Sequence, residues 1–206
     1  MLQVIRAIIL ISALAMAASC GSRGQANAPN WSSLIAASGK SGLAAAGPSA
    51  TRVTSVEDME RVGSFRFVFP SYLPPGMGEV QLDASADTGG LSGGPLRWEQ
   101  VAITPPPRND SPIISIREED LTTCSSPPCF DGREIYLNAS NETIDNTKIH
   151  CDTDSFLSQL ECYWKTEDKW FHVTFTWGGN EPTPTADARE QAMKVVESMI
   201  SAPTHP

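Results

Sequence analysis

The strongest structural pattern in the chain is WFHVTFTW, residues 170–177, in which large apolar side chains alternate with other types. Strict alternation is typical of a β-strand with one buried face. The preceding stretch LECYWKT alternates in the same way, and TEDK between the two is a natural turn, so the two stretches predict an antiparallel hairpin. The buried face of the second strand would carry Phe171, Val173, Phe175 and Trp177.

A helical pattern follows this hairpin in TADAREQAMKVVESMI, residues 185–200. Asp187 and Glu190 have the spacing of a capping box. Strand and helix each need a partner for their apolar side, so we expect the helix to cover the strand and His172 to face solvent. The apolar stripe of the helix consists of Ala188, Ala192, Val195, Val196, Met199 and Ile200.

The N-terminal half predicts a shorter helix and several more strands. Thr54 and Glu57 form a second capping-box pattern at the start of TSVEDMERVGSF. SFRFVF, residues 64–69, alternates like a strand that ends at Pro70, and further strands are expected from Val80, in LRWEQVAI and in PIISIRE. One helix, a run of strands and a final longer helix predict an α+β fold with an antiparallel sheet.

Residues 1–19 have the pattern of a bacterial export signal. One positive charge at Arg6 precedes twelve uncharged residues, Ala7 to Ala18, which are too few to span a membrane and suit the apolar region of a signal peptide. Cleavage after Ala17 would leave Cys20 as an early free thiol. The alternative is cleavage directly before Cys20.

The stretch AASC, residues 17–20, resembles the lipobox of bacterial lipoproteins, although Ala17 stands where that pattern prefers Leu. Apart from Cys20, the chain has four cysteines, an even number that can pair among themselves. We therefore expect Cys20 to carry diacylglycerol and palmitate, and these acyl chains to hold the protein on the extracytoplasmic side of a membrane in the cell envelope.

Composition divides the mature chain into a tether and one domain. Residues 20–50 are rich in Gly, Ser and Ala and predict a flexible tether, with Trp31, Leu34 and Ile35 as an exception that could dock or form a helical turn. Residues 51–206 are long enough for a single domain with its own core.

The net charge excludes one class of partner. Removal of residues 1–19 leaves 14 basic and 24 acidic residues, a net charge of −10. This charge argues against nucleic acid as a partner and leaves the acyl chains as the membrane contact. Acidic groups such as Glu118, Glu119 and Asp120 are expected on a solvated surface.

Two segments carry a resemblance to a known family. VEDMERVGSFRFVFPSYLPPGM, together with YWKTEDKWFHVTF leading into AMKVVESMI, resembles uncharacterised bacterial extracytoplasmic domains. Such domains occur behind lipoprotein signals and at the outer ends of membrane proteins related to anti-sigma factors. The resemblance implies an envelope-facing domain of sheet and helix, without catalytic residues to carry over. The cysteine-containing middle of the chain departs from it.

The four remaining cysteines predict two disulfides in an oxidising compartment, and of three pairings we choose the sequential one, Cys124–Cys129 and Cys151–Cys162. Zinc is the alternative because His150 adjoins Cys151, but neither spacing is that of a zinc knuckle. We expect no metal and no cofactor.

No catalytic constellation is visible, so an enzyme is not expected. A nucleophile elbow of the G-x-S-x-G type is absent, and DASADTGG fails as a calcium loop at Thr88 and Gly94. Tyr72 and Trp170 are the candidate exposed aromatics of an interaction surface. The sequence thus predicts a lipid-anchored binding or sensing domain for an unknown envelope protein or small ligand. The alternatives are a lipid or lipoprotein carrier and an envelope enzyme.

Overall fold

The computed structural model describes residues 28–38, 51–87, 96–105, 113–122, 138–154, 157–177, 185–201 and 203. The described helices are α2 (Trp31–Ser38), α3 (Val56–Gly63) and α5 (Ala186–Ser201). The strands are β1 (Thr51–Val53), β2 (Glu79–Asp87), β3 (Leu96–Thr104), β4 (Ile113–Asp120), β5 (Glu142–Ile144), β6 (Thr147–Asp154), β7 (Gln159–Lys165) and β8 (Lys169–Thr176).

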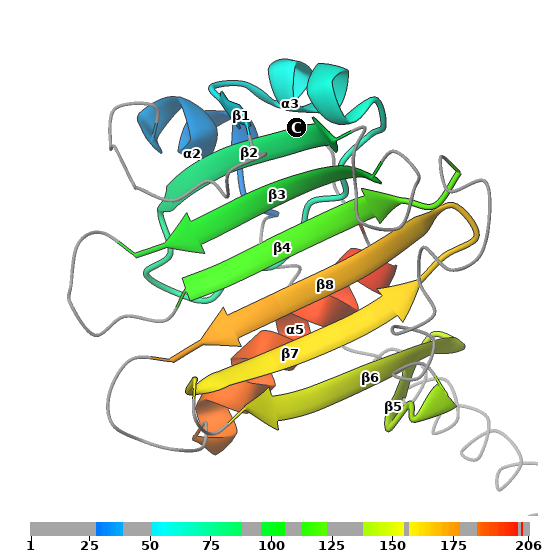
Figure 1. Ribbon diagram of the computed structural model, residues 1–206. Coiled ribbons are helices and arrows are strands. Elements are labelled where there is room, and N and C mark those ends of the chain that lie inside the picture. Colours follow the sequence, from blue (N-terminus) through cyan, green and yellow to red (C-terminus); the bar gives the residue numbers. More distant parts are fainter. Residues whose placement is uncertain are drawn as a thin grey trace, which may run out of the picture.

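All strand pairs are antiparallel, in the order β1-β2-β3-β4-β8-β7-β6-β5 (Figure 1). The predicted α+β class, with a short helix near the N-terminus and a longer one at the C-terminus, is confirmed. The predicted hairpin is β7–β8, and β1, β5 and β6 are strands that the sequence pattern did not reveal. Among the described residues no helix is both long and apolar enough to cross a membrane.

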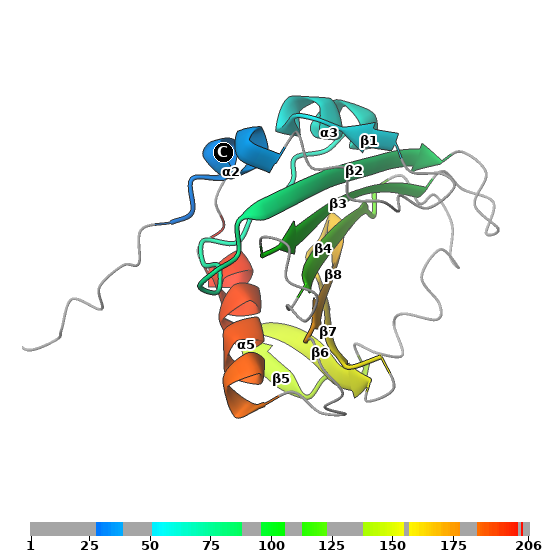
Figure 2. The ribbon, with the colours of Figure 1, turned by 90° about the vertical axis from the view of Figure 1, so that its left-hand side faces the viewer.

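One face of the sheet forms the core. Along β8, Phe171, Val173 and Phe175 lie on this face, and the register places Ile114 and Ile116 of β4 opposite Phe175 and Val173. Helix α5 packs against the β5 and β7 side of the sheet (Figure 2), and its Val195, Val196 and Met199 are buried in the same apolar cluster. The predicted apolar stripe of the helix therefore meets the predicted apolar face of the strand.

The β2–β3 side of the same face is covered by α3 and by the extended segment 65–69. Met59 of α3 and Phe67 and Phe69 of the segment are fully buried and belong to the same cluster as the α5 contacts. Gly63, the last residue of α3, lies so close to Glu99 of β3 that a Cβ atom there would come within 2.2 Å of the Glu99 carboxyl oxygen. Helix α3 can approach the sheet this closely because Gly63 has no side chain.

The strand predicted at residues 64–69 does not form, although two of its three phenylalanines are buried as expected. Ser64 ends α3 in the left-handed conformation, with φ of 65°, and segment 65–69 then runs outside the sheet, with only an isolated bridge at Phe69. The amides of Phe67 and Val68 donate to the carboxylates of Glu60 and Glu118 instead of to a neighbouring strand. Side-chain acceptors thus replace the ladder that alternation alone suggested.

The prediction of a flexible tether over residues 20–50 is wrong for residues 31–38, which form α2 and pack on the domain. The Trp31 ring lies 4.8 Å from that of Phe69, its Nε1 donates to the Pro70 carbonyl at 3.0 Å, and only 2% of the residue is exposed. Ser38 Oγ accepts the amide of Val80 at 2.6 Å. The alternative that the sequence left open, docking of Trp31 and its neighbours, is what the structure contains.

Both predicted capping boxes are shifted in the structure. Ser55, not Thr54, caps α3 and accepts the amide of Asp58, and Thr185, not Asp187, accepts the amide of Ala188 at the start of α5. The capping hydroxyl lies one residue later than predicted in α3 and two residues earlier in α5, and in each case it satisfies a free amide of the first turn.

Candidate functional site

Two carboxylic acids lie side by side inside the domain. Glu99 of β3 and Glu118 of β4 are directly paired across the sheet, and neither is exposed to solvent. Their position follows from the period of two: Glu99 shares the buried face with Val101 and Ile103, and Glu118 shares it with Ile114 and Ile116. A buried ionised carboxylate is costly unless a cation or hydrogen bonds compensate for the lost water.

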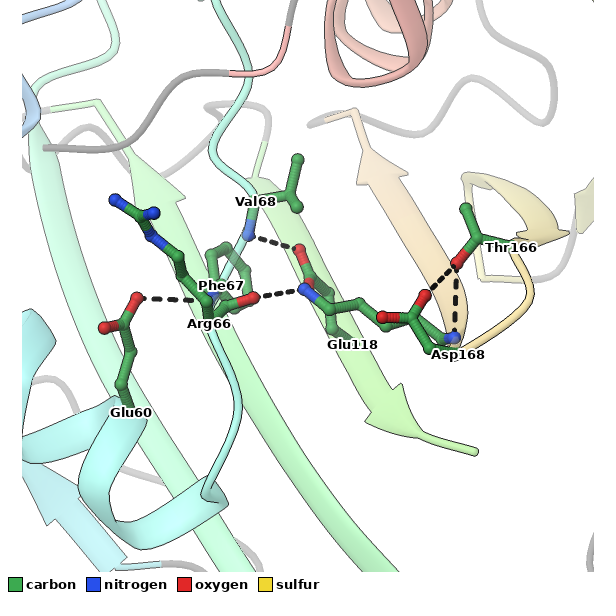
Figure 3. A network of polar contacts seen from close by, with 8 residues as sticks. Glu60, Arg66, Phe67, Val68, Glu118, Thr166 and Asp168 are labelled. Carbon is green, nitrogen blue, oxygen red and sulfur yellow. Dashed lines mark hydrogen bonds and ion pairs between the residues drawn. The ribbon is translucent and has the colours of Figure 1, made fainter. Parts of the chain in front are cut away.

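Lys169, the first residue of β8, compensates for one of the two. Its ammonium lies 2.8 Å from Glu118 Oε2 and also donates to the carbonyl of Arg66 (Figure 3). The rings of Phe65 and Phe171 lie 5.2 and 5.9 Å from the ammonium, within the range of cation–π attraction. One buried cation therefore faces two buried carboxyls.

The segment that replaces a strand is held over this pair by the same groups. Val68 N donates to Glu118 Oε1 at 2.7 Å, and Phe67 N donates to Glu60 Oε1 at 3.2 Å (Figure 3). Glu118 thus binds both Lys169 and the backbone of the segment, and it connects β4, β8 and residues 66–68. Removal of its charge would weaken both of these attachments at once.

Glu99 has no comparable partner. Within the described part of the chain, neither of its carboxyl oxygens accepts a hydrogen bond of normal geometry. Burial, the neighbouring Glu118 and, to a lesser degree, Glu60 raise the pKa of Glu99 to about 9, against the smaller opposing effects of Lys169 and the Phe65 amide. Burial also raises the pKa of Glu118, to about 7, although Lys169 and the Val68 amide oppose the shift.

These contacts define the charge state of the cluster. At neutral pH Glu99 holds a proton, while Glu118, with a pKa of about 7, is partly ionised, and its carboxylate form is balanced by the Lys169 ammonium. The arrangement can store a proton in the core and release it at alkaline pH. Glu60 connects this cluster with a cavity, because its negative charge helps to raise the pKa of Glu99 and its side chain lines that cavity.

That cavity lies between α2 and α3 and has a volume of about 260 Å³. Its lining combines hydroxyl groups, apolar side chains, two acids and one base: Ser32, Ile35, Ala36, Thr54, Ser55, Val56, Glu57, Glu60 and Arg66. Three of the nine lining residues come from α2, which the tether prediction would have left outside the domain. The cavity therefore exists only because α2 is docked.

The prediction that Trp170 is an exposed aromatic is wrong, since only 2% of it is accessible. It does lie on the sheet face opposite α5, as alternation required, but that face has buried side chains of its own. The Tyr163 ring is centred 6.1 Å from that of Trp170, and the Arg117 guanidinium lies 4.5 Å from the Trp98 ring. Glu119 pairs with Arg117 at 2.9 Å on this second layer.

Tyr72, the other candidate for an interaction surface, is half-buried and bonded to α5. Its hydroxyl donates to Gln191 Oε1, and its amide donates to Ser198 Oγ at 3.2 Å. The side chain attaches the proline-rich turn to the C-terminal helix, so its described contacts are structural.

Of the two predicted disulfides, Cys151–Cys162 is present and joins directly paired residues of β6 and β7. Cys20, Cys124 and Cys129 lie outside the described residues, as do Thr88 and Gly94 of the rejected calcium loop. His150 contacts the Ala139 carbonyl through Nδ1 at 2.9 Å. Within the described ranges no three His, Cys, Asp or Glu side chains gather as a metal site.

The acids at positions 118–120 were expected at a solvated surface, and this is wrong: Glu118, Glu119 and Asp120 are all buried. The sequence analysis also did not identify Glu99 as a buried acid. The signal in the sequence was the alternation within each strand, which places Glu99 and Glu118 on the same face as isoleucines and valines. Comparisons with protein families, with curated proteins and with solved structures find no match to this chain.

Proposed function

We propose that this protein is a bacterial lipoprotein, anchored through acyl chains on Cys20, that acts as a non-enzymatic binding or sensing domain on the outer side of a membrane. The anchor rests on the signal-like residues 1–19 and the AASC stretch before the tether. The binding role rests on the way the domain is packed.

The observation that supports binding rather than lipid transport is the filled interface between the sheet and α5. A carrier of this architecture would need apolar space there for acyl chains. The described residues fill that region with Leu160, Val173 and Phe175 from the sheet and Val195 and Met199 from the helix, each at most 4% exposed. The cavity at α2–α3 is too small for a lipid chain and has charged walls. It suits a small polar ligand.

The anchor is tested by expressing the chain with its own signal segment and separating membranes after labelling with a palmitate analogue. The parent protein should be labelled and remain in the membrane fraction after a high-salt wash, whereas Cys20→Ser should lose the label and leave that fraction. Ser22→Ala, two residues away, is the matched control and should behave as the parent does. A Cys20→Ser protein that stays with the membrane would contradict the lipid anchor.

The binding role is tested by native mass spectrometry of the protein extracted from its own membranes. We expect a mass equal to the acylated chain alone. A free fatty acid or a second lipoprotein acyl chain bound at one copy per protein would contradict the proposal and favour the carrier.

A further inference from the structure

We propose that the cavity between α2 and α3 binds a small zwitterion, a molecule of amino-acid size with an ammonium group at one end and a carboxylate or phosphate at the other. This inference rests on the proposed binding function and names its ligand class. It starts from an unusual combination in the lining: Glu60 and Arg66 carry opposite charges, border the same cavity and form no ion pair with each other among the described contacts.

Contacts with neighbouring groups hold the carboxylate of Glu60 and the backbone of Arg66 in place. Glu60 Oε1 accepts the Phe67 amide, which leaves Oε2 for another donor. The Arg66 carbonyl accepts the buried Lys169 ammonium, so the backbone of Arg66 is fixed while its side chain extends from the same segment on the Glu60 side (Figure 3). Within the described part of the chain the Arg66 guanidinium makes no hydrogen bond or ion pair. A fixed carboxylate and a free guanidinium therefore face one space.

The charges in the cavity select between ligand classes. A purely anionic ligand would pair with Arg66 but meet the carboxylates of Glu57 and Glu60, and a purely cationic ligand would meet Arg66. A zwitterion can place its anionic group on the guanidinium, which suits planar oxyanions, and its ammonium on the carboxylates. Both charges of the ligand are then paired.

The cavity volume limits the size of the ligand, and the uncharged side chains of the lining indicate the chemistry of the part between its two charged ends. A volume of about 260 Å³ is below the roughly 300–1,000 Å³ typical of drug-sized ligands. Ile35, Ala36 and Val56 supply apolar surface, and Ser32, Thr54 and Ser55 supply hydroxyl groups. Free amino acids and the ethanolamine phosphate of a lipid head group share this chemistry, and the two sources can be distinguished experimentally.

The test uses the mature full-length protein in detergent, titrated separately with glycine, leucine, glutamate and glycerophosphoethanolamine while its melting temperature is followed. We expect at least one of these zwitterions to raise the melting temperature in a saturable way. Binding of an amino acid would identify the ligand as a free amino acid, and binding of glycerophosphoethanolamine would identify it as the head group of a lipid. The N-acetyl form of the best amino acid, or its methyl ester, should bind at least tenfold more weakly, because each lacks one of the two charges.

Variants locate the site. Arg66→Gln should weaken binding at least tenfold, and Ala36→Trp, which fills the cavity without removing a charge, should abolish it. Arg61→Gln is the matched control: Arg61 is an exposed residue of α3 that pairs with Asp58 and does not line the cavity. It should leave binding unchanged.

Three results would overturn the inference: no response to any of the four zwitterions, equal binding of the single-charge analogues, or binding that survives both Arg66→Gln and Ala36→Trp. The proposed function has separate readouts, the Cys20→Ser fractionation and the mass of the purified protein. A titration without any response would therefore refute the zwitterion site, and the proposed function would still be tested by its own experiments.

Discussion

Glu99→Gln should make the protein more stable at neutral and alkaline pH and should flatten the dependence of its stability on pH. Glu99 has a pKa of about 9 in the folded protein, raised from an ordinary value of 4.5 by burial and by Glu118. Such a group contributes its full stability below pH 4.5, where both folded and unfolded chains hold the proton. That stability is lost as pH rises towards 9, because the unfolded chain releases the proton and the folded chain does not.

The magnitude follows from the shift. Each pH unit between the two pKa values costs about 1.4 kcal/mol, so between pH 5 and pH 8 the wild-type protein should lose about 4 kcal/mol through Glu99. Glutamine is neutral throughout and close in shape to the protonated acid. The difference in unfolding free energy between Glu99→Gln and wild type should therefore grow with pH by the same amount, about 4 kcal/mol.

The assay is urea denaturation of both proteins at pH 5, 6, 7 and 8. Glu118 adds a slope of the same sign in both proteins up to its pKa of about 7, so it cancels in the comparison to first order. Glu119→Gln is the matched control: Glu119 is as deeply buried and adjacent in the chain, but it lies on the other face of the sheet beside Arg117. It should keep the wild-type slope. Parallel curves for wild type and Glu99→Gln would refute the assignment of the proton to Glu99.

Four further variants test the rest of the structure by denaturant unfolding. Phe175→Ala, at a 3% exposed position under α5, should cost about 3–5 kcal/mol through lost burial and a residual cavity; a cost below 1 kcal/mol would contradict its place in the core. Replacing Cys151 and Cys162 together by Ala opens a loop of 11 residues and should cost about 2–3 kcal/mol, and an unchanged midpoint would show that the bridge is not formed. Ser64→Gly, at φ of 65°, should stabilise by about 1 kcal/mol because glycine adopts this conformation without strain, and destabilisation would contradict that backbone. Trp31→Ala should cost about 3–5 kcal/mol and expose residues 31–38 to protease, whereas unchanged proteolysis would mean that α2 is not docked.

The C-terminal half of the fold was predictable because its signals are local. Alternation in residues 170–177 and the stripe on α5 each fix a face, and the two faces have to meet. Segment 64–69 has the same alternation but no strand beside it. Its amides are satisfied by Glu60 and Glu118, 7 and 50 positions away, and alternation contains no information about such acceptors.

The candidate site was missed for a related reason. An acid in a strand is normally assigned to solvent, and only the cross-strand neighbour Glu99 and the ion pair with Lys169 show that Glu118 is paired inside. The docking of α2 was equally hidden. A helix of eight residues is too short to be stable on its own, and it is stabilised by the burial of Trp31 and Ile35 on a domain that is distant in sequence.

The docking of α2 also changes how far an anchored domain could travel. If the anchor is Cys20, the docked part of the chain begins at Trp31 and not at Thr51, so 11 residues instead of 31 precede it from the anchor onwards. At about 3.5 Å per fully extended residue, the maximum distance between the anchor and the docked part of the chain falls from about 110 Å to about 40 Å. The volume that the domain can search then falls roughly twenty-fold, and its effective concentration at the membrane surface rises by the same factor. Encounters would take place within one protein diameter of the bilayer, with the α2 side of the domain nearest to the lipid.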